Sequence, residues 1–311
     1  MVWSMSSLDP SSPAGAHLGA EPSQLRIQTQ QTLAAGLYIV STPIGNLRDI
    51  TLRALDILTN SDEILAEDTR TTRRLLDAYG IKAKLTPYHD HNGAERRPDI
   101  LDKLDAGQAL ALVSDAGTPL ISDPGYKLVS AVRDAGHKVI PIPGASALLA
   151  ALVSSGLPSD QFHFAGFPPQ KTGARKSFLQ DLKSAQATLV FYESPRRLAA
   201  SLADMSGILG DDRQCIVARE LTKLFEEVRS GTLTSLAQHY EEAGAPKGEV
   251  VLLVGPPLSQ QSASQEDIDD ALRHALKSLP LKAAAAELSE RFKLPKRDLY
   301  QRGLTLKDQD T

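Results

Sequence analysis

The stretch that decides the fold is ALALVSDAG at residues 109–117, where five apolar residues are followed at once by small and acidic residues. An unbroken apolar run of this length is typical of a strand that is buried on both faces of a sheet. Similar short runs occupy residues 37–40, 63–66 and 138–142. We therefore expect four buried strands in the first half of the chain.

Helix signals separate these strands. Thr69 is a suitable N-cap for a helix that runs to Tyr79, and Asp123 before Pro124 is typical of another helix start, with Gly136 as its end. Ser146 is a suitable cap for an apolar helix over residues 147–154. The alternation of strands and helices predicts an open, mainly parallel α/β sheet.

The second half has a different pattern. Five further strands are predicted, and those near the end are joined by turns rather than helices, which indicates a mixed sheet with antiparallel members. The predicted strands are residues 162–166, 188–192, 214–218, 226–231 and 249–254. The sequence thus predicts two α/β domains, with a hinge at residues 155–158.

The two ends of the chain differ from the middle. The start is rich in Ser, Pro, Gly and Ala without hydrophobic periodicity, which is typical of a disordered tail. Near the other end, helices are predicted at 266–279, 282–292 and 296–302, the last ended by Gly303, and the final pair has the spacing of a helix-turn-helix. The predicted division is a tail at 1–35, domains at 36–155 and 156–257, a linker at 258–265 and a helix-turn-helix-like domain at 266–306.

Composition excludes several classes of protein. The chain has 311 residues, with 34 Lys and Arg against 38 Asp and Glu, so its net charge of −4 argues against a generally basic nucleic-acid-coating protein. One cysteine, Cys215, allows no internal disulfide, which favours a reducing, cytoplasmic compartment. The longest apolar stretch, residues 147–153, is far shorter than the roughly 20 residues that cross a bilayer, and we expect neither a membrane span nor a secretory signal.

Charge is unevenly distributed along the chain. Residues 282–302 hold six basic and three acidic side chains, a net +3 in an otherwise acidic chain. This segment is either a small helical cap with solvated lysines or a nucleic-acid contact.

Small, turn-forming and acidic residues follow four successive strands, at 41–46, 67–70, 114–119 and 143–146. In open parallel sheets, ligands bind beyond the carboxyl ends of the strands, so these loops predict a small-molecule site. The dinucleotide, P-loop and nucleophile-elbow motifs are absent from the sequence. We interpret His89-Asp90-His91-Asn92 as a polar surface turn and predict no metal site. Glu67 and Asp68 are either partners of Arg70 or acids of the site.

Several long motifs, in order, carry a resemblance to a known family. They closely resemble the bacterial 16S ribosomal RNA cytidine 2′-O-methyltransferases, the RNA-modifying branch of the tetrapyrrole methylase family of S-adenosylmethionine-dependent enzymes. The resemblance runs from about residue 37 to residue 302 and includes the terminal helices. Ser41 stands where the family usually has Pro, and the N-terminal tail is longer than usual. The motifs are LYIVSTPIGNLRDITLRALDIL (37–58), AEDTRTTRRLL (66–76), HDHN (89–92), LVSDAGTPLISDPGYKLV (112–129), PIPGASALLAALVSSGLP (141–158), FAGFPP (164–169), FYESPRRL (191–198) and ARELTK (218–223).

The resemblance implies two α/β domains with the methyl donor, S-adenosylmethionine, in the cleft between them. Asp115 and Ser146 also have simpler interpretations, as a turn former and a helix cap, and a helix N-terminus suits polar ligand groups in any case. The residues that the resemblance places at the donor are Pro43, Ile44, Gly45, Ser114, Asp115, Ala116, Gly117, Ser146, Ala147, Tyr192 and Ala218.

The implied reaction is methyl transfer from a sulfonium to the ribose 2′-hydroxyl of a cytidine in the decoding region of 16S ribosomal RNA. Placement of the hydroxyl is a main contribution, and a base adds a further factor of roughly 10² to 10⁴. We favour Asp68 or Glu193 as the base, because each ends a strand near the cleft. The other candidates are Glu67, Asp115, His89 and His91.

RNA binding needs cations against phosphates. The resemblance also implies a small ribosomal subunit as the partner and a homodimeric enzyme. Two alternatives stay open: a methyltransferase acting on a tetrapyrrole or another small molecule, and a non-catalytic ribosome-binding protein with the same fold. The predicted RNA-contacting residues are Arg70, Lys171, Arg175, Lys176, Arg196, Arg197, Lys293, Lys296 and Arg297.

Overall fold

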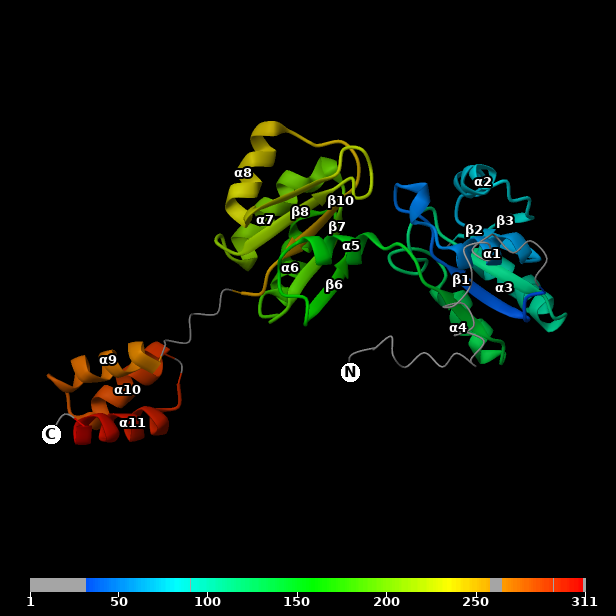
Figure 1. Ribbon diagram of the computed structural model, residues 1–311. Helices are drawn as coiled ribbons and strands as arrows, with labels where there is room; N and C mark the ends of the chain where they lie inside the picture. The colour runs from blue at the N-terminus through cyan, green and yellow to red at the C-terminus, as the bar shows by residue number, and fades with distance from the viewer. Residues whose placement is uncertain (1–31, 90, 258–264, 293, 310–311) are drawn as a thin grey trace, which may run out of the picture.

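The computed structural model describes residues 32–89, 91–257, 265–292 and 294–309. Within these ranges the chain forms two α/β domains and a C-terminal helical module (Figure 1). The predicted tail and linker fall almost entirely outside the described residues, as does Lys293. None of the helices in the described part of the chain is long and apolar enough to cross a membrane.

The first sheet has five parallel strands in the order β3-β2-β4-β1-β5, which confirms the predicted parallel sheet. Four of these strands match the predicted runs to within a residue. The fifth, β3, was not predicted, because it has three residues and is only partly buried. The strands are β1 (Gly36–Val40), β2 (Glu63–Ala66), β3 (Leu85–Pro87), β4 (Ala109–Val113) and β5 (Val139–Ile142).

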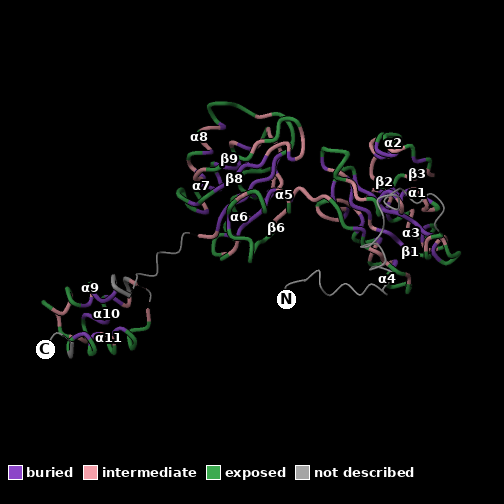
Figure 2. The backbone as a smooth tube through the Cα atoms, in the orientation of Figure 1, coloured by how far each residue is buried: buried purple, intermediate pink, exposed green. Residues whose placement is uncertain are grey.

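Helices cover both faces of this sheet. On one face α1 (Leu52–Asn60) and α2 (Thr69–Ala78) pack against alternate strand residues such as Val40 and Ala111. On the other face α3 (Gly93–Asp105) and α4 (Tyr126–Asp134) pack against the intervening residues, such as Leu110 and Leu112. Burial on both faces explains why the strands are continuous apolar runs. Figure 2 shows the buried strands between exposed outer helix faces.

Two predicted helix starts in this domain are wrong by one to three residues. The N-cap of α2 is Asp68, whose carboxylate accepts the Arg70 N–H, rather than Thr69. The helix expected at Asp123-Pro124 begins only at Tyr126, after Gly125 at φ 131°. Residues 118–125 form a loop instead, with Leu120 and Ser122 also at positive φ. This difference matters because it leaves Asp123 available to a site.

The second sheet has the order β6-β7-β10-β8-β9, in which β6 and β7 are parallel and the other pairs antiparallel. The prediction of a mixed sheet is confirmed. Helices α6 (Thr172–Leu182), α7 (Leu198–Leu209) and α8 (Leu233–Ala243) cover one face. The strands are β6 (Phe162–Gly166), β7 (Thr188–Glu193), β8 (Gln214–Arg219), β9 (Glu227–Thr232) and β10 (Val250–Val254).

The other face of the second sheet is covered by α5 (Ala147–Ser154), in the same core cluster as Val190, Ile216 and Leu253. The predicted boundary at residue 155 put this helix in the first domain. Its buried side chains, Leu148, Ala151 and Leu152, lie instead against the second. The chain therefore crosses between the domains just before α5, and the apolar character of that helix reflects this interface.

The C-terminal module has its own small core, formed by α9 (Gln265–Leu276), α10 (Leu281–Phe292) and α11 (Lys296–Gln309). The predicted helix pair is confirmed, but Gly303 does not end its helix. A Cβ at Gly303 would lie 2.5 Å from Leu281 Cδ1, so this glycine permits close packing of α11 on α10. The module matches the predicted helix-turn-helix-like unit.

Candidate functional site

Three loops at the carboxyl ends of the first sheet are joined by hydrogen bonds. The first loop (residues 41–46) pairs with Gly117 through Thr42, whose N–H and C=O bond the glycine C=O and N–H at 2.8 and 3.0 Å. Gly117 has φ +79°, and a Cβ there would lie 3.3 Å from Ile44. Thr118 Oγ1 donates to the Ala145 carbonyl at 3.1 Å. The loops after β1, β4 and β5 thus form one rigid edge.

A cleft of about 470 Å³ lies between this edge and the second domain. Its volume falls in the range of about 300–1,000 Å³ that small-molecule sites occupy. We call it the interdomain cleft. The predicted donor residues that line it are Ile44, Asp115, Ala116, Gly117, Ser146, Ala147, Tyr192 and Ala218.

A second hollow of about 350 Å³ opens beside the cleft. We call it the adjoining cavity. It is lined by the remaining predicted donor residues, Pro43, Gly45 and Ser114. The two spaces share lining residues, and these are Ile44, Asp115, Ala116 and Glu249.

The cleft contains acidic side chains in a partly desolvated setting. Partial burial raises the pKa of Asp115, although the Asp68 N–H that donates to Asp115 Oδ1 at 3.0 Å opposes the rise. Burial also raises the pKa of Asp123, against a hydrogen bond from Ser114, and the pKa of Tyr192. Sequence reasoning missed Asp123 because Asp-Pro looked like a helix start. Its place ten residues after the end of β4 was the signal that could have found it.

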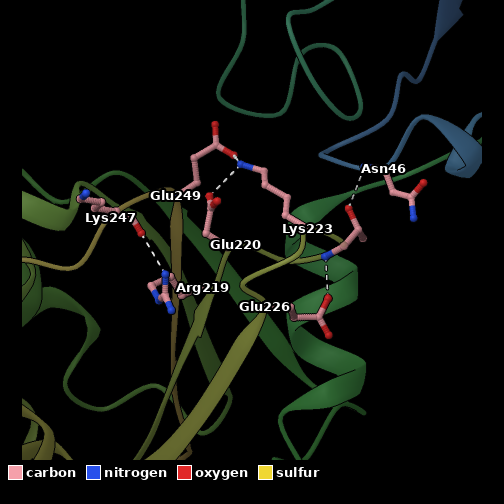
Figure 3. Close-up of polar contacts among 8 residues, drawn as sticks. Asn46, Arg219, Glu220, Lys223, Glu226, Lys247 and Glu249 are labelled. Carbon is pink, nitrogen blue, oxygen red and sulfur yellow. Dashed lines mark hydrogen bonds and ion pairs between the residues drawn. The ribbon is translucent and has the colours of Figure 1, made fainter.

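The loop after β8, residues 220–226, reaches across to the first domain (Figure 3). Glu220 and Thr222 adopt positive φ angles of 52° and 66°. Thr222 Oγ1 accepts the Asn46 N–H at 3.2 Å, and Lys223 Nζ lies 2.8 Å from Glu220 and 2.9 Å from Glu249. We call this segment the Lys223 loop. It links the first loop to the start of β10.

The geometry disfavours Asp68 as a base. Arg70 lies 2.6 Å from its carboxylate, and this side-chain hydrogen bond lowers the pKa of Asp68 to about 2. A carboxylate with so low a pKa has little tendency to take a proton. Asp68 is better described as the N-cap of α2 whose backbone N–H positions Asp115.

Glu193 is also unsuited to proton transfer. Its side chain is fully buried, lies 2.5 Å from Arg197, and accepts the Ser194 N–H at 2.6 Å and the Ser201 hydroxyl. With these partners its oxygens are already occupied. Glu193 forms part of the cleft wall as a structural residue, and its geometry disfavours the predicted role as a base.

The predicted RNA-contacting arginines are not equally available. Arg175 is buried and lies 2.6 Å from Asp204, so its guanidinium cannot meet a phosphate at the surface, contrary to the prediction. Arg197 is held by Glu193 and by the Pro168 carbonyl. Lys293 lies outside the described residues. The exposed members are Arg70, Lys171, Lys176, Arg196, Lys296 and Arg297.

The histidine-containing turn is organised by its asparagine. Asn92 accepts the His89 N–H at 2.9 Å and donates to the Pro87 carbonyl at 3.0 Å. Neither histidine lines the cleft or the adjoining cavity. In the described part of the chain no group of three or more His, Cys, Asp or Glu side chains is arranged to hold a metal ion.

Comparison with known proteins shows which family the sequence matches. The profile of the tetrapyrrole (corrin/porphyrin) methylases matches residues 36–237, and that of the RsmI C-terminal HTH domain matches residues 262–307. Ribosomal RNA small subunit methyltransferase I of Mesorhizobium japonicum is 52% identical over 276 residues, which cover 89% of this chain and 94% of that protein. The protein of the same name from Vibrio cholerae is 49% identical, covering 86% and 94%.

Solved structures agree on the fold. Uroporphyrin-III-C-methyltransferase from Thermus thermophilus aligns with a TM-score of 0.52 at 21% identity, covering 71% of this chain and 94% of that one. A complex of that enzyme with S-adenosylhomocysteine aligns at 0.50 and 18%, covering 71% and 97%. At such identities the likeness concerns the fold alone. The sequence matches go further: the chain belongs to the tetrapyrrole methylase family, in the branch of the ribosomal RNA small subunit methyltransferase I proteins.

Proposed function

We propose that this chain transfers a methyl group from S-adenosylmethionine to the ribose 2′-hydroxyl of a cytidine in the decoding region of 16S ribosomal RNA. The observation that carries the proposal is the interdomain cleft, in which residues of both domains from the family motifs come together. The relatives that share about half of the sequence over most of its length are named as ribosomal RNA small subunit methyltransferases, which supports methyl transfer to that RNA.

The cleft fits the donor chemically. S-adenosylmethionine carries a sulfonium and an amino group, and Asp115, Asp123 and Glu67 line the cleft with negative charge. Small residues such as Gly117 and Ala218 allow the backbone to approach a ligand, while Leu221 and Val251 supply apolar wall for an adenine ring.

The sulfonium supplies an activated methyl group, so the protein has to place the hydroxyl and remove its proton. Asp115 suits this second task better than Asp68 or Glu193. It is accessible from solvent, it lies where the two spaces meet, and partial desolvation of its carboxylate raises its pKa. We assign it to accept the hydroxyl proton as the carbon–oxygen bond forms and the carbon–sulfur bond breaks. The Asp68 N–H fixes its orientation.

RNA binding is assigned to the exposed cations around the cleft and to the C-terminal module. Lys296 and Arg297 lie exposed at the start of α11. With a net charge of −4 on the whole chain, contact with phosphates has to be confined to such patches. We further propose that the acceptor is the RNA within a small ribosomal subunit and that the enzyme acts as a homodimer.

A tetrapyrrole methyltransferase is the competing function, since solved neighbours act on such substrates. The C-terminal HTH match and the STPIG first loop favour RNA. The test is mass spectrometry of 16S ribosomal RNA from cells with and without this protein, together with calorimetric titration of S-adenosylmethionine. We expect one cytidine to lose its ribose methyl group and the donor to bind. Unchanged ribose methylation would refute the RNA assignment, and absent donor binding would refute the enzyme assignment.

A further inference from the structure

The adjoining cavity is separate from the cleft assigned to the donor but opens onto it. Its walls come from the first loop, from the first turns of α2 and from the Lys223 loop. Both domains therefore build it, at the edge where ligands of parallel α/β sheets bind.

Two hydroxyls in its walls are unsatisfied. Thr42 and Thr72 are each 3% exposed, and within the described ranges neither Oγ1 has a hydrogen-bond partner. Buried polar atoms are nearly always paired, and leaving one unpaired costs stability. Both threonines line the same cavity, so rotation of either hydroxyl toward it would supply a hydrogen bond to a ligand there.

The cavity also offers positive charge. Two cations, Arg74 and Lys223, line it. Lys223 is already neutralised by Glu220 and Glu249. Arg74 is exposed and has no ion-pair partner in the part of the chain that the structure describes. A free guanidinium in the cavity lining suits a phosphate, which it can hold through two parallel N–H donors.

The remaining wall is apolar, from Pro43, Leu47 and Leu75, and Leu47 is 47% exposed. These side chains suit the face of a flat ring. Asp115 stands at the opening into the cleft. The cavity thus combines a cation for a phosphate, an apolar wall for a base and, where it meets the cleft, the Asp115 carboxylate for a ribose hydroxyl, which are the groups that one nucleotide requires.

We infer that the adjoining cavity is the subsite for the acceptor nucleotide, in which Arg74 binds the phosphate next to the methylated ribose and Thr72 bonds the nucleoside. This inference rests on the proposed function. It predicts an extruded nucleotide, since a base stacked within a helix could not reach into a hollow between two domains. In this assignment Pro43, Gly45 and Ser114 contact the acceptor nucleotide rather than the methyl donor.

The first test compares Arg74→Ala with Arg73→Ala. The two arginines are neighbours on α2 and both are exposed, but Arg73 does not line the cavity and donates to the Ala83 carbonyl. Methyl transfer is measured on small ribosomal subunits from cells that lack this protein. We expect Arg74→Ala to raise the KM for subunits about tenfold, as the loss of a charge-assisted hydrogen bond would, with Arg73→Ala close to wild type.

The second test compares Thr72→Val, which removes the hydroxyl at constant shape, with Thr72→Ser, which keeps it. We expect the valine variant to raise the KM for subunits about tenfold and the serine variant to restore it. Calorimetry should give all four variants the wild-type Kd for S-adenosylmethionine, and thermal unfolding should confirm that they are folded.

The outcomes separate the two proposals. Weaker donor binding in Arg74→Ala would mean that the cavity holds part of the donor, and equal effects of Arg73→Ala and Arg74→Ala would mean only general charge attraction. Each would overturn the subsite while leaving the methyltransferase intact. If the wild-type protein methylates no subunit RNA, the proposed function fails first and the subsite fails with it.

Discussion

Asp115 is the residue on which the chemistry of the site depends most. It lies at the opening between the interdomain cleft and the adjoining cavity, and the Asp68 N–H holds its carboxylate at 3.0 Å. The sequence predicted Asp115 as a donor contact and as one of several candidate bases. Only the structure could choose among those bases. The candidates all follow strands in the sequence, but they differ in the hydrogen-bond and ion-pair partners that folding gives them.

Replacing Asp115 with Asn tests its role in proton transfer. We expect kcat to fall by about 10² to 10⁴. In the wild-type protein a carboxylate with a raised pKa must be ionised to accept a proton, so kcat/KM should fall as pH drops through that pKa. The variant should lack this acidic limb in its profile of kcat/KM against pH.

Asp68→Asn is the matched control. Because the pKa of Asp68 is about 2, its titration cannot produce a limb in the accessible pH range, and the backbone N–H that orients Asp115 stays in place. An acidic limb that survives in Asp115→Asn but vanishes in Asp68→Asn would contradict the assignment.

Glu63 provides a stability prediction away from the site. Burial alone would raise its pKa, but hydrogen bonds from Lys84, Thr86 and Lys103 lower it to about 2, from an ordinary 4.5. A depressed folded-state pKa adds stability above the unfolded pKa, and that stability is lost as pH falls from about 5 toward 2. We expect Glu63→Gln to lower the free energy of unfolding by about 2–3 kcal/mol at pH 7, and by progressively less below pH 5.

Urea denaturation at several pH values measures this difference. Asp99→Asn is the control, since Asp99 is an exposed partner of Lys103 and should contribute little. A constant difference between wild type and Glu63→Gln from pH 7 to pH 3 would show that the glutamate is not held in its ionised form.

At the scale of elements, the sequence predicted what depends on local pattern. Short apolar runs predicted the buried strands of both sheets, and Gly136 predicted the end of α4. Two errors share one cause: a residue type that usually marks a helix end has a different role in the folded chain. Gly303 permits contact with Leu281 instead of ending a helix, and Asp123 lies in a loop lining the cleft instead of capping one. Short β3 had no pattern long enough to detect.

The loop between α8 and β10 offers a test at this scale. Gly248 has φ +96°, and a Cβ there would overlap the Glu220 side chain, whose carboxylate binds Lys223 and the Glu249 N–H. We expect Gly248→Ala to displace Glu220, loosen the Lys223 loop and weaken S-adenosylmethionine binding several-fold in calorimetry.

Gly244→Ala is the control that distinguishes steric overlap with Glu220 from backbone strain at a positive φ. Gly244 has a similar φ of +79° but open space around its Cβ position, so the alanine variant should cost about 1–3 kcal/mol of stability and leave donor affinity unchanged. Equal donor affinities in the two variants would show that the position of Glu220 does not matter for the site.

At the scale of the whole molecule, the C-terminal module and the two α/β domains have separate hydrophobic cores. The core of the C-terminal module contains residues of α9, α10, α11 and the turn between the last two, and the four other core clusters contain none of them. The two α/β domains therefore have complete cores without the module, and the interdomain cleft has no lining residue from it.

Removing the residues after Pro257 should consequently leave the donor Kd unchanged and weaken RNA binding by about tenfold or more. The dependence of RNA affinity on salt should also become shallower, since each lost phosphate contact reduces the slope by about one. Filter binding to 16S ribosomal RNA over a range of salt concentrations measures both. A truncated protein that loses donor binding but keeps its RNA affinity would contradict this division.

The sequence by itself determined the two α/β domains, the helical module and the family, because these depend on hydrophobic periodicity, capping and long motifs that lie within continuous stretches. Only the tertiary structure decided which residues act. It paired Arg175 with Asp204 and Arg197 with the Pro168 carbonyl, packed α5 against the second domain, and placed Thr42 and Thr72 in the lining of one cavity. The reason is physical: whether a charge or hydroxyl is free for a ligand depends on partners distant in the chain, which folding alone brings near.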